Sequence, residues 1–137
     1  SVTVQALINR IMKNGKKSVA TRMMYDALDM IRERAKRDPI EVLDLAMKNV
    51  GPLMEVRPRR VGGSTYQVPM EVSNDRRQTL AMRWILASSR SRSGKSFSEK
   101  LSAELMEAAN NQGASVRKRE ETHKMAEANR AFSHFRI

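Results

Sequence analysis

The 137-residue sequence contains no cysteine, which excludes disulfide bonds and thiolate zinc sites and fits a reducing compartment. Aromatic residues make up only 4% of the chain, so we expect an aliphatic core, which suits packed helices better than a β-sandwich. No apolar run reaches the roughly 18 residues of a membrane-spanning helix, so a membrane is the weaker candidate partner. The first residues do not resemble a signal or transit peptide.

Acidic residues are scarce relative to basic ones. Fifteen Asp and Glu stand against 26 Lys and Arg, and the resulting net charge of +11 attracts polyanions through their phosphates. Residues 1–37 contain nine cations and three acids, and residues 73–97 contain six and one. Residues 38–51 and 98–116 each contain one cation and three acids. This sorting predicts a phosphate-binding face on the first, second and fourth helices, and an acidic side that faces solvent or other proteins.

Apolar residues recur with a helical period in six segments, each bounded by capping or helix-breaking residues. The predicted helices cover residues 4–12, 18–37, 38–51, 73–91 and 96–113, and a last segment from about 115. The expected caps and ends are Asn14–Gly15, Asp38, Gly51–Pro52, Ser73, a Ser96–Glu99 capping box and Gly113. The last helix is expected to present Met125, Ala128 and Phe132 on one apolar face. The predicted fold class is mainly α: a single domain over residues 1–137, with a two-stranded β-hairpin arm at about 53–72 between the third and fourth helices.

The predicted hairpin is marked by a change of the apolar period to two. Residues 54–72 read MEVRPRRVGGSTYQVPMEV, in which Gly62 and Gly63 suit a tight turn. Pro58 and Pro69 cannot donate to a ladder, so both strands must be edges or extend beyond a sheet. The segment also carries three arginines, Arg57, Arg59 and Arg60. One interpretation is a hairpin folded back on the helices with solvated arginines; we favour a ribbon that reaches into nucleic acid and is mobile before it binds.

The fourth predicted helix carries a row of arginines. Arg76, Arg83 and Arg90 recur every seven residues, a spacing that drifts by only about 20° per step around an α-helix. Their side chains lie about 10 Å apart along the axis and could follow a phosphate backbone. The neighbouring cations are Arg77, Arg92 and Lys95. A solvated charged face is the simpler explanation, but such faces normally mix signs, and no glutamate lies four residues from any of the three arginines.

A further basic segment surrounds the predicted turn between the first two helices. It contains Lys13, Lys16 and Lys17, and Arg10 precedes it. Backbone N–H groups at the start of the following helix would add to its attraction for phosphate. Because basic loops are common, the segment is a weak indication by itself.

Motifs that could indicate an enzyme do not fit. The SGKS sequence Ser93–Ser96 resembles the end of a P-loop, but Ser89 stands where the first glycine is required, inside a helix and after no strand. His123 and His134 are the only histidines, and their separation of eleven residues suits neither a metal site nor a catalytic dyad. We therefore predict no catalytic residue, metal ligand, cofactor or small-molecule substrate, and no enzymatic activity.

Four segments match the pattern of a known family: residues 9–27 (NRIMKNGKKSVATRMMYDA), 59–72 (RRVGGSTYQVPMEV), 80–84 (LAMRW) and 118–136 (KREETHKMAEANRAFSHFR). They resemble the seventh protein of the small ribosomal subunit, in its bacterial or organellar form. The resemblance implies a primary binder of the 3′ major domain of small-subunit rRNA that nucleates assembly of the subunit head. It also implies a hairpin near exit-site tRNA and the mRNA path, on a ribosome of the cytoplasm or of an organelle.

The resemblance also implies roles for individual residues. The implied rRNA contacts are Lys16, Lys17, Arg59, Arg60, Arg76, Arg77 and Arg83. The implied neighbours of tRNA and mRNA are Val61, Gly62, Gly63, Ser64 and Tyr66. The implied surface for another small-subunit protein comprises Arg117, Lys118, Arg119, Phe132 and Phe135. Relatives usually carry a basic arm before the first helix, whereas Ser1 stands almost at that helix here.

Two other functions are considered beside the ribosomal one. A DNA-bending architectural protein would also use a basic β-arm, with Pro69 as its wedge, but such proteins usually act as dimers and no dimer seam is evident. An RNA-modifying enzyme would need a cofactor loop or a general base, and neither is visible in the sequence. We predict a protein that is monomeric outside the ribosome and holds folded RNA through phosphate and sugar contacts, with specificity from RNA shape.

Overall fold

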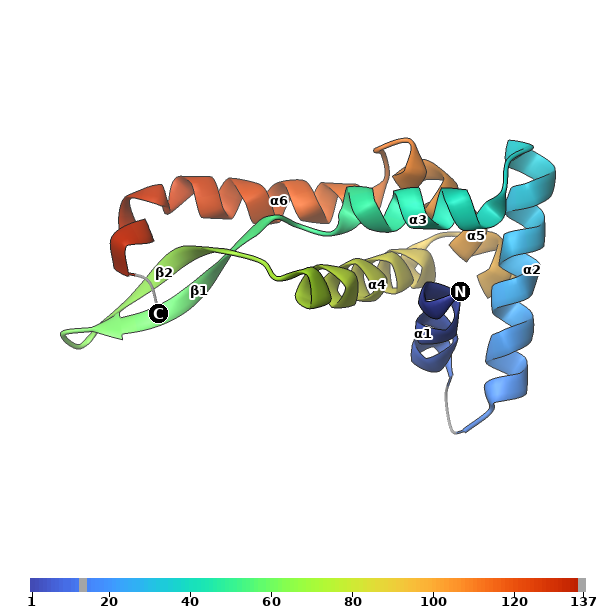
Figure 1. Ribbon diagram of the computed structural model, residues 1–137, viewed down its shortest axis with the longest axis horizontal. Coiled ribbons are helices and arrows are strands. Elements are labelled where there is room, and N and C mark those ends of the chain that lie inside the picture. Colours follow the sequence, from blue (N-terminus) through green and yellow to red (C-terminus); the bar gives the residue numbers. More distant parts are fainter. Residues whose placement is uncertain (13–14, 136–137) are drawn as a thin grey trace.

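The computed structural model describes residues 1–12 and 15–135, which form a helical body with a projecting hairpin (Figure 1). Its elements are, in order, α1 (Val2–Ile11), α2 (Lys17–Ala35), α3 (Pro39–Val50), β1 (Met54–Val61), β2 (Ser64–Glu71), α4 (Asn74–Ser91), α5 (Phe97–Ala109), α6 (Ala114–Ala128) and the 3₁₀-helix η1 (Arg130–Phe135). The predicted mainly α fold, with a hairpin between the third and fourth helices, is confirmed.

Three predicted N-caps explain where helices begin. The Asp38 side chain accepts a hydrogen bond from the N–H of Ile40 at 3.0 Å, and Ser73 caps α4 in the same manner. The Ser96 hydroxyl accepts from the N–H of Glu99 at 3.1 Å. The Glu99 carboxylate then accepts from the N–H of Lys95 at 3.3 Å, one residue before the cap. The hydrogen bond to the Ser96 side chain thus confirms one half of the predicted capping box. The bond to the Glu99 side chain comes from Lys95 instead of Ser96, so the other half is displaced by one residue.

Two helix ends differ from the predicted ones. α2 begins at Lys17 instead of Ser18, and no described side chain caps it. α5 ends at Ala109, four residues before the predicted stop at Gly113, which instead serves as the N-cap of α6 with φ +97°. The φ of Gly113 favours glycine, and a Cβ there would also lie 2.8 Å from Oε2 of Glu107, so that side chain would have to shift. The predicted stop at Asn14 lies outside the described residues.

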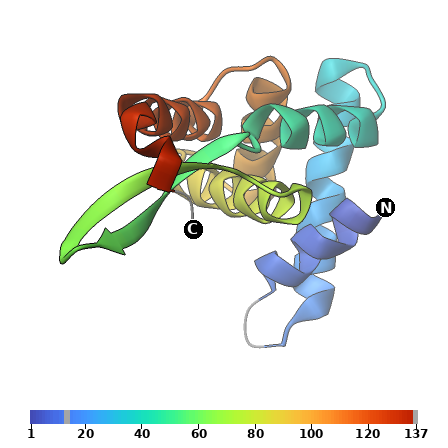
Figure 2. The same cartoon turned by 60° about the vertical axis from the view of Figure 1, so that its left-hand side comes forward.

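The core centres on α5, which packs against α2, α3 and α4 (Figures 1 and 2). Its largest fully buried apolar side chains are Leu7, Met24, Ile31, Leu43, Ile85, Leu101 and Leu105. Each such side chain contributes about 1.5–3 kcal/mol through its removal from water. α1 packs on α2 at the edge of this core, and α1, α2 and α4 each keep one face toward solvent.

The C-terminal helix packs differently from the predicted arrangement. Met125 is 51% exposed and Ala128 is exposed, while Phe132 lies beyond α6, in η1. The residues that α6 buries are Ser115, Val116 and Ala126. The predicted apolar face of this helix is therefore wrong, because only the first turn of α6 reaches the apolar core, and the rest runs along the hairpin (Figure 1).

The hairpin has the predicted turn and a simple antiparallel register from Met54↔Glu71 to Val61↔Ser64. Gly62 and Gly63 have φ values of +58° and +84°, which suit a type I′ turn. Both strands are edges, as the prolines require, because the sheet has two strands. Toward its base Val68 and Pro69 are buried, and β2 contacts η1, whereas residues 60–65 at the tip are exposed. The base is folded onto the C-terminal segment and the tip projects (Figure 2).

Candidate nucleic-acid interface

Arg76, the first member of the arginine row on α4, is held by the hairpin. Its Nε and Nη2 donate to the two carboxylate oxygens of Glu55 on β1, at 2.6 and 2.9 Å. This bidentate hydrogen bond raises the pKa of the guanidinium. The pair ties the start of α4 to the base of the hairpin, so the predicted rRNA contact by Arg76 would compete with an internal ion pair.

Arg92, just after α4, lies in a second ion-pair network. Its guanidinium donates to Glu104 at 2.9 Å and to Glu107 at 3.1 and 3.3 Å. These hydrogen bonds, that with Glu107 foremost, raise the pKa of Arg92, and the bond from Arg92 lowers the pKa of Glu107. Glu104 is fully buried and also accepts from the N–H and hydroxyl of Ser115 at 3.2 and 2.6 Å. The prediction that the acids of residues 98–116 face solvent or other proteins is wrong for Glu104, because its charge is balanced inside the protein.

Two further predicted contact residues are half-buried. Arg77 donates to the carbonyl of Gly51 at the end of α3, at 3.3 Å. Arg119 donates to the carbonyl of Asn49 at 2.6 Å and to the side chain of Asn111 at 3.0 Å. Both arginines therefore satisfy carbonyl groups at the C-terminal end of α3, where cations are favoured by the helix dipole.

Other predicted contact residues point into solvent. Among the predicted rRNA contacts, the exposed cations that form no ion pair with a described residue are Arg10, Lys16, Lys17, Arg60, Arg83, Arg90 and Lys95. Arg57 is about half exposed and lies 3.8 Å from Glu55. Arg59, opposite Tyr66 in the hairpin register, is half-buried. Lys13 lies outside the described residues. The structure thus divides the predicted contacts into internal ion pairs and open cations.

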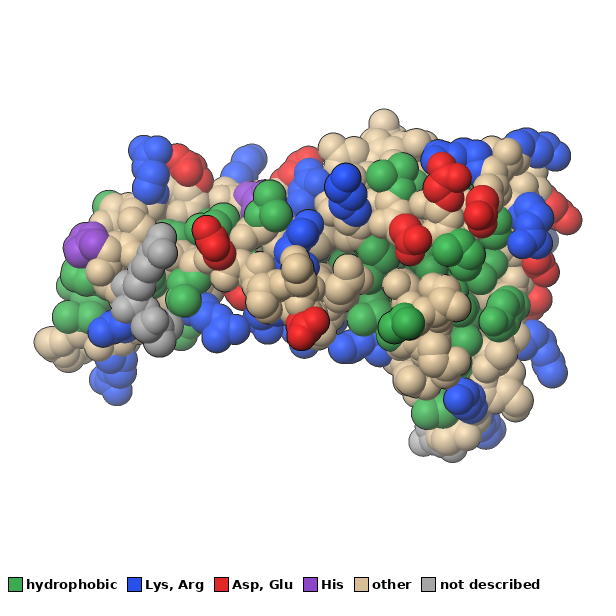
Figure 3. All heavy atoms as spheres, in the orientation of Figure 1, with side chains coloured by type: hydrophobic (Ala, Val, Ile, Leu, Met, Phe, Trp, Pro, Cys, Tyr) green, Lys and Arg blue, Asp and Glu red, His purple; other side chains and the backbone are tan. Residues whose placement is uncertain are grey.

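The open cations among the predicted rRNA contacts include residues of α4, of the start of α2 and of the hairpin. Arg83 and Arg90 project from α4, Lys16 and Lys17 stand at the start of α2, and Arg60 is near the hairpin tip. Lys and Arg side chains recur along the lower margin of Figure 3, from the hairpin at the left to helices α1 and α2 at the right. We call the open cations of α4 and of the start of α2 the cationic face. The first turn of α2 receives no cap from a described side chain, and the N-terminal end of a helix favours an anion.

Strand β2 and the C-terminal segment share an aromatic cluster that the sequence did not predict. The ring centroid of Tyr66 lies 5.1 Å from that of Phe132 and 5.0 Å from that of Phe135. Tyr66 was expected beside tRNA and mRNA, and the two phenylalanines beside another protein. In the structure these three residues contact one another and pack η1 against β2, and each stays partly exposed. Val61 to Ser64, at the tip, remain exposed, as do Arg117 and Lys118 on α6.

His123 joins α6 to the start of the hairpin. Its Nε2 accepts a hydrogen bond from the N–H of Leu53 at 2.9 Å. Burial lowers the pKa of His123, and the nearby charges of Arg119 and Arg77 lower it further. The neutral imidazole is therefore the form that supports this contact. The sequence spacing of the two histidines gave no indication that His123 would accept a hydrogen bond from the start of the hairpin.

Among residues 1–12 and 15–135, no group of three or more His, Cys, Asp or Glu could hold a metal ion. The helices in the same part of the chain are all too short or too polar to cross a membrane. What the described residues do provide is a rigid helical body, a face of open cations and an arginine-bearing hairpin.

These features define a basic, helical nucleic-acid-binding protein with a β-arm. A family model described as "Ribosomal protein S7p/S5e" matches residues 1–130, and the chain belongs to this family. It is therefore an RNA-binding ribosomal protein and not an enzyme, as predicted.

The similarity to individual relatives extends over nearly the whole chain. The small ribosomal subunit protein uS7 of Xanthobacter autotrophicus is 60% identical over 136 residues, which cover 99% of this chain and 87% of the relative. The uS7 protein of Caldanaerobacter subterraneus shows the same identity and coverage. That of Roseiflexus castenholzii is 56% identical over 98% of this chain and 86% of its own. This membership favours the ribosomal interpretation over that of a DNA-bending protein.

Proposed function

We propose that the chain is a structural constituent of the small ribosomal subunit that binds the 3′ major domain of its rRNA directly and nucleates assembly of the subunit head. The observation that carries the proposal is the cationic face. Arg83 and Arg90 of α4, with Lys16 and Lys17 before and within α2, are four open cations, and Lys16 and Arg90 line one cleft. The names of the bacterial relatives support the small subunit and a ribosome of the cytoplasm, with an organellar ribosome as the alternative.

The mechanism is the positioning of RNA. Arg83 and Arg90 lie seven residues apart, so they can contact phosphates about 10 Å apart along the axis of α4. The ion pairs of Arg76 and Arg92 fix the two ends of the same helix, one to the hairpin and the other to α5. The row is thus held rigid before RNA binds, which reduces the entropy lost on association.

The hairpin provides a second contact in this proposal. Its tip, Val61 to Ser64, is exposed, and Arg60 precedes it. The tip lies at the far end of the molecule from α1 and α2 (Figure 1), so it can approach exit-site tRNA and the mRNA path while the cationic face holds rRNA. Arg117 and Lys118 on α6 supply the surface for a neighbouring small-subunit protein.

The proposal is tested by titrating the protein with a folded junction of the 3′ major domain of rRNA, and with random duplex DNA, over a salt series. For roughly 6–10 phosphate contacts the affinity for either ligand should fall about 10³–10⁵-fold between 50 and 200 mM salt. We expect a large preference for the RNA junction at the higher salt concentration, where non-specific contacts are weakest. Equal affinity for the DNA under that condition would contradict the proposal.

A further inference from the structure

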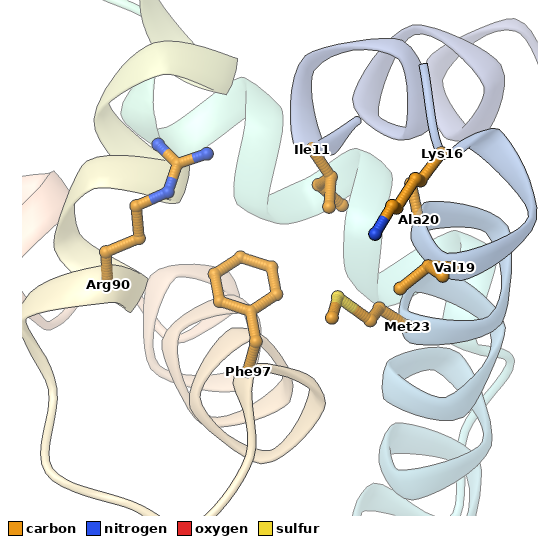
Figure 4. A pocket seen from close by; sticks show the side chains of 7 residues that line it. All are labelled: Ile11, Lys16, Val19, Ala20, Met23, Arg90 and Phe97. Carbon is orange, nitrogen blue, oxygen red and sulfur yellow. The ribbon is translucent and has the colours of Figure 1, made fainter. Parts of the chain in front are cut away.

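An apolar cleft opens within the cationic face, between α1, α2, the end of α4 and the start of α5 (Figure 4). Its volume is about 280 Å³. The lining residues are Ile11, Lys16, Val19, Ala20, Met23, Arg90 and Phe97. This volume lies just below the usual range of about 300–1,000 Å³ for sites that hold drug-sized ligands. The cleft therefore suits one group smaller than a typical drug molecule.

The side chains of the cleft combine apolar walls with a charged rim. In Figure 4 the ring of Phe97 stands in the middle, with Arg90 on one side and Lys16 on the other. The guanidinium carbon of Arg90 lies 6.0 Å from the centroid of that ring. Val19 is 40% exposed, although it is a large apolar residue at the mouth. Phe97 is half-buried and packs against the core, so only part of its ring borders the cleft. A partly exposed apolar surface between two cations favours an occupant that combines an apolar part with negative charge.

We propose that this cleft receives one unpaired RNA base, which stacks on Phe97 while Lys16 and Arg90 contact the phosphates on either side of it. The inference rests on the proposed function and adds to it a site for a single base. Unpaired bases in RNA are commonly held by stacking on aromatic rings and guanidinium groups, and the adjoining backbone by cations. An apolar side chain of a neighbouring protein would fill the cleft but leave both cations without a counter-charge.

The position of Arg90 links the cleft to the phosphate row. Arg90 is the last of the regularly spaced arginines of α4 and also part of the cleft lining. An RNA strand that follows the row from Arg83 would reach the mouth of the cleft at Arg90. A base turned out of its helix at that point could enter without a break in the phosphate contacts.

The test uses two variants of the cleft and one matched control. Val19→Glu places a carboxylate at the mouth, where it opposes both the base and its phosphates. Phe97→Leu keeps an apolar side chain against the core but removes the aromatic face. Val2→Glu makes the same change of charge at an 89% exposed valine of α1 that does not line the cleft. Thermal unfolding of each variant verifies that it is folded before binding is measured.

Each protein is titrated with a fragment of small-subunit rRNA that contains the 3′ major domain, and the unpaired bases of the complex are probed with base-specific chemical reagents. Loss of a stacked base should weaken binding roughly 5- to 150-fold in Val19→Glu and in Phe97→Leu. We expect at least one unpaired base to lose its protection in both variants, with the other protections kept. Val2→Glu should retain that protection and bind more tightly than Val19→Glu.

The possible failures are distinct. If the wild-type protein does not bind the fragment, both the proposed function and the base site are wrong. If it binds, but Val19→Glu and Phe97→Leu keep its affinity and its protected bases, only the base site is wrong. An equal loss in Val2→Glu and Val19→Glu would reduce the effect to net charge and overturn the inference. If Phe97→Leu alone kept the affinity and the protected bases of the wild type, the inference would also be overturned, since an apolar group and not a stacked base would then occupy the cleft.

Discussion

Arg76 and Arg83 belong to one row on α4, but their guanidinium groups have different surroundings. Arg76 forms a bidentate pair with Glu55, whereas Arg83 is exposed and forms no ion pair with a described residue. A paired guanidinium must lose strong hydrogen bonds before it can bind phosphate, while an open one exchanges only water. The spacing of seven predicts the row, and the contacts across the fold decide which arginine is available.

The strongest prediction for a single residue concerns the contribution of Glu104 to stability. Replacement by Gln removes the fully buried charge that faces Arg92 and Ser115. We expect the free energy of unfolding to fall by about 3 kcal/mol, because Arg92 and the Ser115 hydroxyl lose a charged acceptor in a low-dielectric site. Urea denaturation measures the loss. The control is Asp44→Asn on the exposed side of α3, which should change stability by less than about 0.5 kcal/mol. Equal effects of the two changes would show that the Glu104 network is not stabilising.

At the scale of elements, α6 and the hairpin stabilise each other. His123 of α6 accepts from the N–H of Leu53 before β1, and Tyr66 of β2 packs on two phenylalanines of η1. An isolated two-stranded ribbon is marginal in water, so these contacts explain how its base is held in the free protein. The sequence-based expectation that the hairpin becomes ordered only with RNA remains a prediction, and it now concerns the exposed tip most directly.

The lowered pKa of His123 predicts a pH dependence of stability. The ordinary pKa of 6.5 applies to the unfolded chain, and the folded value is lower because of burial and nearby arginines. As pH falls below 6.5, the imidazole binds a proton in the unfolded chain but not yet in the folded protein, so the free energy of unfolding decreases. The decrease should end once pH has passed the folded pKa.

Chemical denaturation between pH 7.5 and about 5 measures this dependence. His123→Gln should be less stable than the wild type at the higher pH but should lack the decline below the histidine pKa. His134→Gln, at the exposed histidine of η1, should leave the decline unchanged. If the decline in the free energy of unfolding persisted in His123→Gln, other titrating groups would be its cause.

On the scale of the whole molecule, some cations are open to solvent while others are held in internal ion pairs. The cationic face carries Arg83 and Arg90, while Arg92, at the end of the same helix, is turned inward to Glu104 and Glu107. Net charge alone attracts any polyanion, but an ordered face can follow one particular RNA shape. The two-faced arrangement predicts that position on the surface, and not total charge, determines the effect of a charge reversal.

Arg83→Glu and Arg32→Glu test this arrangement because they change the net charge equally. Arg32 is 65% exposed near the far end of α2 and pairs with Asp29. We expect Arg83→Glu to weaken binding of 3′ major domain rRNA roughly 10- to 150-fold and to reduce the salt slope by about one, since it removes a charge-assisted phosphate contact. Arg32→Glu should change affinity several-fold at most. Similar losses in both variants would contradict a localised cationic face.

Much of the fold follows from local patterns. Asp38, Ser73 and Ser96 cap the helices that the sequence predicted, and Gly62–Gly63 makes the predicted turn. These features depend on residues within one turn of each other, so they are visible in a short window. The sequence misassigned Gly113 as the end of α5. Gly113 is the N-cap of α6, and its positive φ and its approach to the Glu107 side chain follow from packing that a short window does not show.

The sequence by itself determined the mainly helical fold with its hairpin, the excess of cations and the family to which the chain belongs. Only the tertiary structure decided which cations face solvent, that Glu104 is buried, and that Tyr66 contacts Phe132. It also formed the cleft around Phe97 from four elements. The physical reason is range: periodicity and capping act over a few neighbouring residues, whereas ion pairs, ring contacts and clefts require side chains that are distant in the chain to meet in the packed protein.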